Sequence, residues 1–101
     1  MITDYDKRQL RQMAESIQLF ENKKLSLSDV VNRLVDLLDA IESIDIDWKK
    51  QFKSEWWQLE QVNATILDKG LILLPKEYKD IVEDSISKLK KMIDTMLLCE
   101  E

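Results

Sequence analysis

Apolar residues recur at every third or fourth position along four stretches of this chain, and that spacing restricts most of it to amphipathic helices. In the first stretch, about residues 4–22, an apolar stripe is formed by Leu10, Met13, Ile17 and Phe20. Thr3 is the expected N-cap, with Asp4 and Asp6 in the first turn, where the helix dipole favours acids. One glycine and one proline in 101 residues leave few of the tight turns that a β fold needs. The pattern therefore predicts an all-α protein.

Three further helices follow from the same spacing and from end signals. The second begins at Ser26 or Ser28, where Ser26 and Asp29 resemble a capping box, and its apolar stripe continues to Ile44. The third spans about residues 46–69, with Leu67 as the last residue of its apolar face, and ends before Gly70, a good residue for a helix C-terminus. The fourth starts near Pro75, which suits a first helical turn.

The connections between these helices are short, which favours antiparallel neighbours. We therefore expect a single domain, residues 1–101, folded as an antiparallel four-helix bundle. The apolar connector 71–74 is expected to pack down as a buried turn, with a short strand as the alternative.

The net charge of −5 bears on partners and location. An acidic chain repels phosphate backbones and anionic lipid, so direct contact with nucleic acid or with a membrane is not expected. Unbroken apolar runs reach only four residues, and the first residues are acidic where a secretory signal is basic. The single cysteine, Cys99, leaves no internal disulfide. These features together predict a cytoplasmic protein.

The chain contains no histidine, which removes Ser-His-Asp triads, histidine metal sites and imidazole acid–base chemistry. It also lacks a glycine-rich phosphate loop and a cysteine pair. Its carboxylates do not supply the Glu-x-x-His motifs of a di-metal helical bundle. We therefore expect no catalytic residues, no metal and no cofactor, and a protein that is not an enzyme.

Acidic residues concentrate in the second helix and the turn after it. Residues 26–47 carry six acids and one base, whereas the segments on either side are nearly balanced. Like charges this close repel, so one interpretation is a surface kept for a cationic partner, and the other is an ordinary solvated helix face. The six acids are Asp29, Asp36, Asp39, Glu42, Asp45 and Asp47.

Three tryptophans lie within ten residues of the third helix. Trp48 and Trp56 share its apolar face and are expected to pack in the core. Trp57 points away from that face, so it is either covered by another helix or available as an interface anchor.

Asn63 falls near the centre of the apolar face of the third helix and Glu60 flanks it. They either hydrogen-bond to a neighbouring helix or to each other, or belong to a ligand site. Glu55 also faces inward, with a position at the bundle end as the alternative.

A resemblance rests on residues 56–64, which fit the pattern W-x-x-L-E-x-x-[NY]-A through Trp56, Leu59, Glu60, Asn63 and Ala64. The helix at residues 25–38 is similar to one that often precedes that pattern. Together they resemble a group of small, acidic, all-helical bacterial proteins. Some of these are immunity proteins of contact-dependent inhibition and related polymorphic toxin systems.

The resemblance implies a protein that binds and neutralises a cognate toxin with a basic surface, a nuclease in particular. The six acids would then meet lysines and arginines of the toxin, and Trp57 or Tyr78 would supply buried contact area. The alternative is a helical protein–protein interaction module or homodimeric adaptor. Whether the chain is a monomer or a homodimer stays open.

Overall fold

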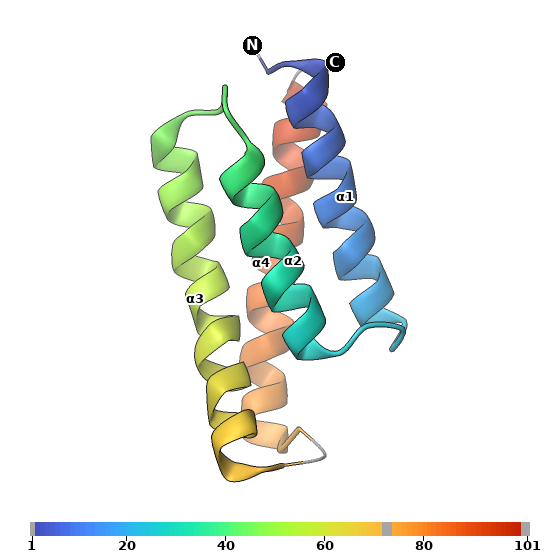
Figure 1. Ribbon diagram of the computed structural model, residues 1–101, viewed down its shortest axis with the longest axis vertical. Helices are drawn as coiled ribbons and strands as arrows, with labels where there is room; N and C mark the ends of the chain where they lie inside the picture. Colours follow the sequence, from blue (N-terminus) through green and yellow to red (C-terminus); the bar gives the residue numbers. More distant parts are fainter. Residues whose placement is uncertain (1, 72–73, 100–101) are drawn as a thin grey trace.

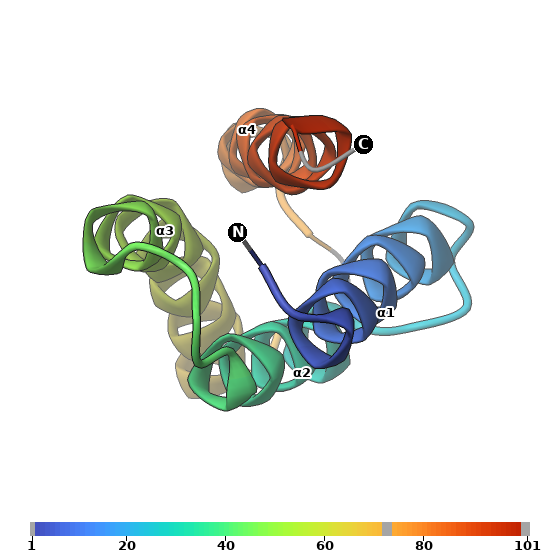
Figure 2. The ribbon, with the colours of Figure 1, turned by 90° about the horizontal axis from the view of Figure 1, so that it is seen from above.

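The computed structural model describes residues 2–71 and 74–99, which form four α-helices and no strand. The helices run in alternating directions along the long axis (Figure 1). Seen from above, they lie around a ring in chain order, each contacting two neighbours and not the helix diagonally opposite (Figure 2). This arrangement confirms the antiparallel four-helix bundle. The helices are α1 (Asp4–Glu21), α2 (Leu27–Ala40), α3 (Ile46–Lys69) and α4 (Lys76–Cys99).

Local chemistry fixes the helix ends where the sequence predicts them. The Thr3 hydroxyl accepts a hydrogen bond from the N–H of Asp6, which caps α1. Ser26 and Asp29 form the expected capping box at α2. Gly70 ends α3 in the left-handed conformation at φ 64°, which glycine adopts without steric cost.

The end of α2 differs from the prediction. The helix stops at Ala40, and Ile41 adopts an extended conformation, although Ile41 and Ile44 are both buried as the apolar stripe predicts. The two isoleucines therefore enter the core from a turn. The turn is held by a buried carboxylate, Asp6, whose partners lie too far along the sequence for periodicity to reveal.

One core occupies the centre of the ring, and Ile2 is buried with it. Trp56 belongs to this core, and its indole N–H donates a 2.8 Å hydrogen bond to the Val31 carbonyl of α2. This bond removes the cost of burying a polar N–H group. Trp48 is half-buried and stacks on Phe52 at 5.2 Å between ring centroids.

The helices differ in length, and this leaves part of the bundle uncovered. The pair α3 and α4 has 24 residues each, whereas α1 has 18 and α2 has 14. At about 1.5 Å per residue, α3 is roughly 15 Å longer than α2. The excess projects beyond the α1–α2 connection at the lower end in Figure 1. Leu67, expected on the core face, lies in this region and is 66% exposed.

One expectation falls outside the described part of the chain. The turn or strand expected at the connector depends on residues 72 and 73, which are not described. The side chain of Cys99 is not described either.

Candidate functional site

The acidic residues singled out from the sequence all have exposed side chains. We call these six residues, on α2 and the turn that follows it, the acidic surface. Asp36 and Asp39 lie on the side of α2 opposite the buried residues Val30, Leu34 and Leu38. The surface therefore runs along α2 and over the turn toward α3. Its members are Asp29, Asp36, Asp39, Glu42, Asp45 and Asp47.

None of the ion pairs that join described residues involves the acidic surface. Those ion pairs are Lys88 with Glu55, Lys88 with Asp84, and Lys90 with Glu21, and they lie on other faces of the bundle. Within ion-pair distance, the acidic surface is thus not neutralised by any lysine or arginine of residues 2–71 and 74–99.

The one base of this segment, Arg33, lies close to the acidic surface. Arg33 and Asp36 line a shallow hollow between α2 and α1, together with Gln12 and Glu15. The edge of the acidic surface that faces α1 therefore combines both charge signs. The turn at its other end contains no basic residue of its own up to Asp47, although the Lys49 ammonium lies against its Ile41 carbonyl.

Two members of the acidic surface also have structural roles. The Asp29 carboxylate accepts a hydrogen bond from the Ser26 N–H, and the Ser26 hydroxyl accepts one from the Asp29 N–H at 3.1 Å. The Asp45 carboxylate caps α3 by accepting a 3.1 Å hydrogen bond from the Asp47 N–H. Both carboxylates sit at positive ends of helix dipoles, which stabilises them. Their conformations are therefore fixed before any partner arrives.

A buried carboxylate holds the turn that carries the rest of the acidic surface. Asp6 is 0% exposed, and one of its oxygens accepts a 3.1 Å hydrogen bond from the Glu42 N–H. The other oxygen accepts from the Ser43 N–H at 2.8 Å and from the Ser43 hydroxyl. The Lys49 ammonium binds the same turn by donating to the Ile41 carbonyl at 2.8 Å. The N-terminal turn of α1 thus clamps the α2–α3 turn.

These contacts set the ionisation of Asp6. Burial by itself would raise the pKa of Asp6, but the hydrogen bonds from Ser43 and Glu42 and the charge of Lys49 outweigh it and lower the pKa. Asp6 is therefore ionised at neutral pH. From the sequence, Asp6 is expected only as an acid of the first helical turn. The signal that could have found its role is that Asp6 precedes Leu10 by four residues and so continues the buried stripe of α1.

The aromatic candidates are placed differently from each other. Trp57 is 51% exposed, whereas its neighbour Trp56 is buried. The side chain of Trp57 therefore points toward solvent, and its role as an interface anchor stays a prediction. Tyr78 is half-buried against the core in the first turn of α4. Because α4 lies diagonally opposite α2, the structure does not bring Tyr78 beside the acidic surface. A shared interface of the two remains a prediction.

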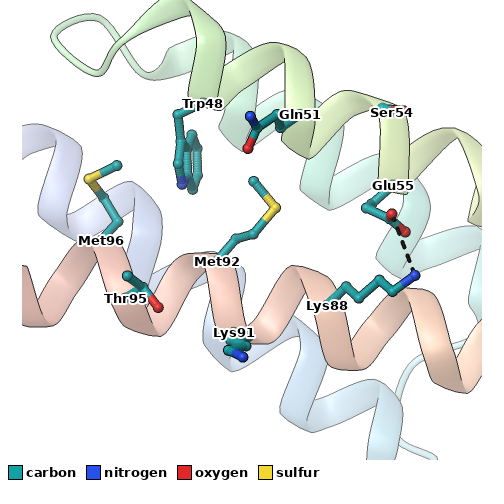
Figure 3. Close-up of a pocket in the computed structure, with 9 residues that line it drawn as sticks. All are labelled: Trp48, Gln51, Ser54, Glu55, Lys88, Lys91, Met92, Thr95 and Met96. Atoms are coloured by element: carbon teal, nitrogen blue, oxygen red, sulfur yellow. Dashed lines mark ion pairs between the residues drawn. The ribbon is translucent and has the colours of Figure 1, made fainter.

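A hollow that the sequence did not indicate lies between α3 and α4, and we call it the upper groove (Figure 3). It has a volume of about 640 Å³, and Trp48, Met92 and Met96 point into it from the two helices. The Glu55 carboxylate and the Lys88 ammonium close one end at 3.9 Å. Glu55, expected on the inner face, is therefore half-buried and paired across the helices.

The polar residue predicted at the centre of the α3 stripe is indeed buried. Asn63 is 7% exposed, and no hydrogen bond between described residues uses its side chain. It faces a larger hollow at the lower end of the bundle. The hydrogen bond to a neighbouring helix or to Glu60, expected from the sequence, is thus not found among residues 2–71 and 74–99.

Among the described residues we find neither a candidate metal site nor a candidate membrane-spanning helix. No three carboxylates or thiols of the described residues come together as a metal site. None of the described helices has an apolar stretch of the length and low charge that crossing a bilayer requires.

Comparisons with protein-family models, curated proteins and solved structures found no match to this chain.

Proposed function

We propose that this chain is an immunity protein, which binds a toxin of the same bacterium and blocks it through the acidic surface. One observation carries the proposal: none of the six carboxylates forms an ion pair with a described residue. Charges that stabilise a fold are usually paired or dispersed, whereas an unpaired cluster costs stability through repulsion. Such a cluster is accounted for when a cationic partner supplies the missing charges.

The chemistry of nuclease toxins fits this surface. A nuclease holds phosphate backbones with lysines and arginines, so it presents a cationic surface that an acidic protein can occupy. Opposite fields also accelerate the encounter of the two proteins. The clamp by Asp6 and the caps by Asp29 and Asp45 support this role, because a preformed surface loses little entropy on binding. The resemblance of residues 25–67 to immunity proteins adds the class of partner.

Such a binding protein works in the cytoplasm and needs no catalytic group. Two features of the sequence support this: it contains no histidine, and it contains a single cysteine. The partner is a basic toxin domain, and contact with nucleic acid is made by that domain and not by this chain.

The direct test is co-expression with the product of the gene immediately upstream. The unmodified chain should form a purified complex with that product and restore growth of a host that produces it. In the acidic-surface variant, the capping carboxylates of Asp29 and Asp45 are kept and the other four acids are neutralised, which should reduce both effects. The changes are Asp36→Asn, Asp39→Asn, Glu42→Gln and Asp47→Asn.

A matched control changes the net charge equally on α3 and α4, with Asp68→Asn, Glu77→Gln, Asp80→Asn and Asp94→Asn. The control should protect like the unmodified chain. If both variants lose binding and protection equally, net charge and not the acidic surface is responsible. If neither variant loses them, the electrostatic mechanism is wrong.

A second candidate function is a homodimeric helical adaptor. Trp57 and Ile46 are both strongly exposed, and their spacing places them on the same outward side of α3. Exposed large apolar residues are enriched at interfaces. Sedimentation velocity over a range of concentrations tests this alternative. A dimer that dissociates on Trp57→Ala substitution would support it, and a monomer at all concentrations would reject it.

A further inference from the structure

The lower end of the bundle contains a second hollow, which we call the lower groove. It forms because α3 and α4 extend past the α1–α2 connection, so the last turns of α3 and the first turns of α4 lack two neighbouring helices. Its volume is about 1030 Å³, at the upper end of the range typical of ligand pockets. The apolar side chains that line it are Phe20, Leu27, Ile66, Leu74, Val82 and Ile86.

The charge of the lower groove is opposite to that of the protein. Four lysines and two glutamates line it, although the chain as a whole carries −5. Lys90 is paired with Glu21 at 3.2 Å, whereas Lys23, Lys24 and Lys79 take part in no ion pair that joins described residues. A ligand that enters this groove therefore meets an apolar surface and a cationic rim.

Asn63 distinguishes between two kinds of anionic ligand. Asn63 is 7% exposed and lines the groove, and none of the hydrogen bonds that join residues in 2–71 and 74–99 uses its side-chain amide. An alkyl chain laid against this amide would leave both its donor and its acceptor unsatisfied, which is costly. A peptide backbone supplies an N–H and a carbonyl that match the amide.

We propose that the lower groove is a second binding site, which takes an acidic peptide segment with apolar side chains. The apolar side chains of the peptide cover the groove floor, its carboxylates pair with Lys23, Lys24 and Lys79, and its backbone pairs with Asn63. The site is separate from the acidic surface and selects a ligand of opposite charge. It does not depend on the proposed toxin-binding function.

The test uses the folded chain and three synthetic heptapeptides in isothermal titration calorimetry. The probe is acetyl-Glu-Leu-Ala-Glu-Leu-Leu-Glu-amide. One control peptide replaces every glutamate by lysine, and the other replaces every leucine by serine. Only the probe should bind, and its affinity should fall as salt rises, because the rim charges are exposed to solvent.

Two variants locate the binding. Lys23→Gln, Lys24→Gln and Lys79→Gln together should weaken it roughly tenfold, whereas Lys50→Gln, Lys53→Gln and Lys91→Gln on other faces should leave it unchanged. Asn63→Leu keeps the branched shape and the number of heavy atoms of the side chain and should weaken binding roughly fivefold. Circular dichroism confirms that each variant retains its helices.

The proposal fails if the probe does not bind, if the lysine peptide binds equally well, or if both lysine variants behave alike. Titration with dodecanoate tests the other kind of ligand. Binding of dodecanoate in the lower groove without binding of the probe would identify a site for anionic amphiphiles and overturn the peptide assignment.

Discussion

Asp6 joins the first turn of the chain to the turn that carries Glu42, Asp45 and Asp47. Its carboxylate is fully buried and accepts hydrogen bonds from two backbone N–H groups and one hydroxyl. Asp6→Asn would place an amide N–H₂ against a backbone N–H. We expect a loss of about 3 kcal/mol in unfolding free energy, measured by urea denaturation at pH 7. Asp4→Asn, an exposed change in the same helical turn, should have little effect.

The same residue predicts how stability depends on pH. The pKa of Asp6 is lowered in the folded state from an ordinary value of 3.8, so its contribution is complete above that value. The contribution is lost as pH falls through the lower folded-state pKa, because the unfolded chain binds the proton first. The stability difference between the unmodified chain and Asp6→Asn should therefore be constant near neutral pH and shrink below about pH 4. A difference that grows with acidification would contradict this assignment.

The adjacent tryptophans offer a second comparison at the residue scale. Trp56→Phe removes the hydrogen bond to the Val31 carbonyl and some buried surface, and it should cost about 1–2 kcal/mol of unfolding free energy. Trp57→Phe changes an exposed ring and should stay within about 0.5 kcal/mol of the unmodified chain. Thermal and urea unfolding of the pair measure both. Equal effects would show that Trp57 is covered in solution.

At the scale of the helix, two residues at helix ends adopt the left-handed backbone conformation, and only one of them is a glycine. Gly70 and Lys23 both have φ 64°, at the ends of α3 and α1. A Cβ atom at Gly70 would meet no other atom within 4 Å, so Gly70→Ala should cost about 1 kcal/mol through the backbone alone. Lys23→Gly should raise the unfolding free energy by about 0.5–1 kcal/mol. Opposite signs in urea unfolding support this account, and equal signs contradict it.

Elements were predictable where their determinants are local. The Ser26–Asp29 box and Gly70 act within a few residues, so the start of α2 and the end of α3 follow from the sequence. The end of α2 does not, because Asp6 holds the turn across 36 residues. Leu67 fits the apolar stripe of α3, yet it is exposed, since α2 begins too far along the bundle to cover it. Both grooves depend on such relative positions, which periodicity does not encode.

At the scale of the whole molecule, the α2–α3 turn and the lower groove differ in charge. The α2–α3 turn carries Glu42, Asp45 and Asp47, whereas Lys23, Lys24 and Lys79 surround the lower groove. The turn follows the end of α2 and the groove includes residues at its start, so about 20 Å of helix separates them, more than two Debye lengths at physiological salt. Each region therefore attracts its own class of ligand, and neutralising one should leave binding at the other intact.

The central claim for the whole molecule is that the acidic surface steers and docks a basic protein. The decisive measurement is the association rate constant of this chain with the product of the upstream gene, followed by stopped-flow over a range of ionic strength. The unmodified chain and the α3–α4 control should associate rapidly at low salt and slow steeply as salt rises. The acidic-surface variant should associate roughly tenfold more slowly, with a weaker dependence on salt. An acidic-surface variant that matches the unmodified chain in both rate and salt dependence would contradict the claim.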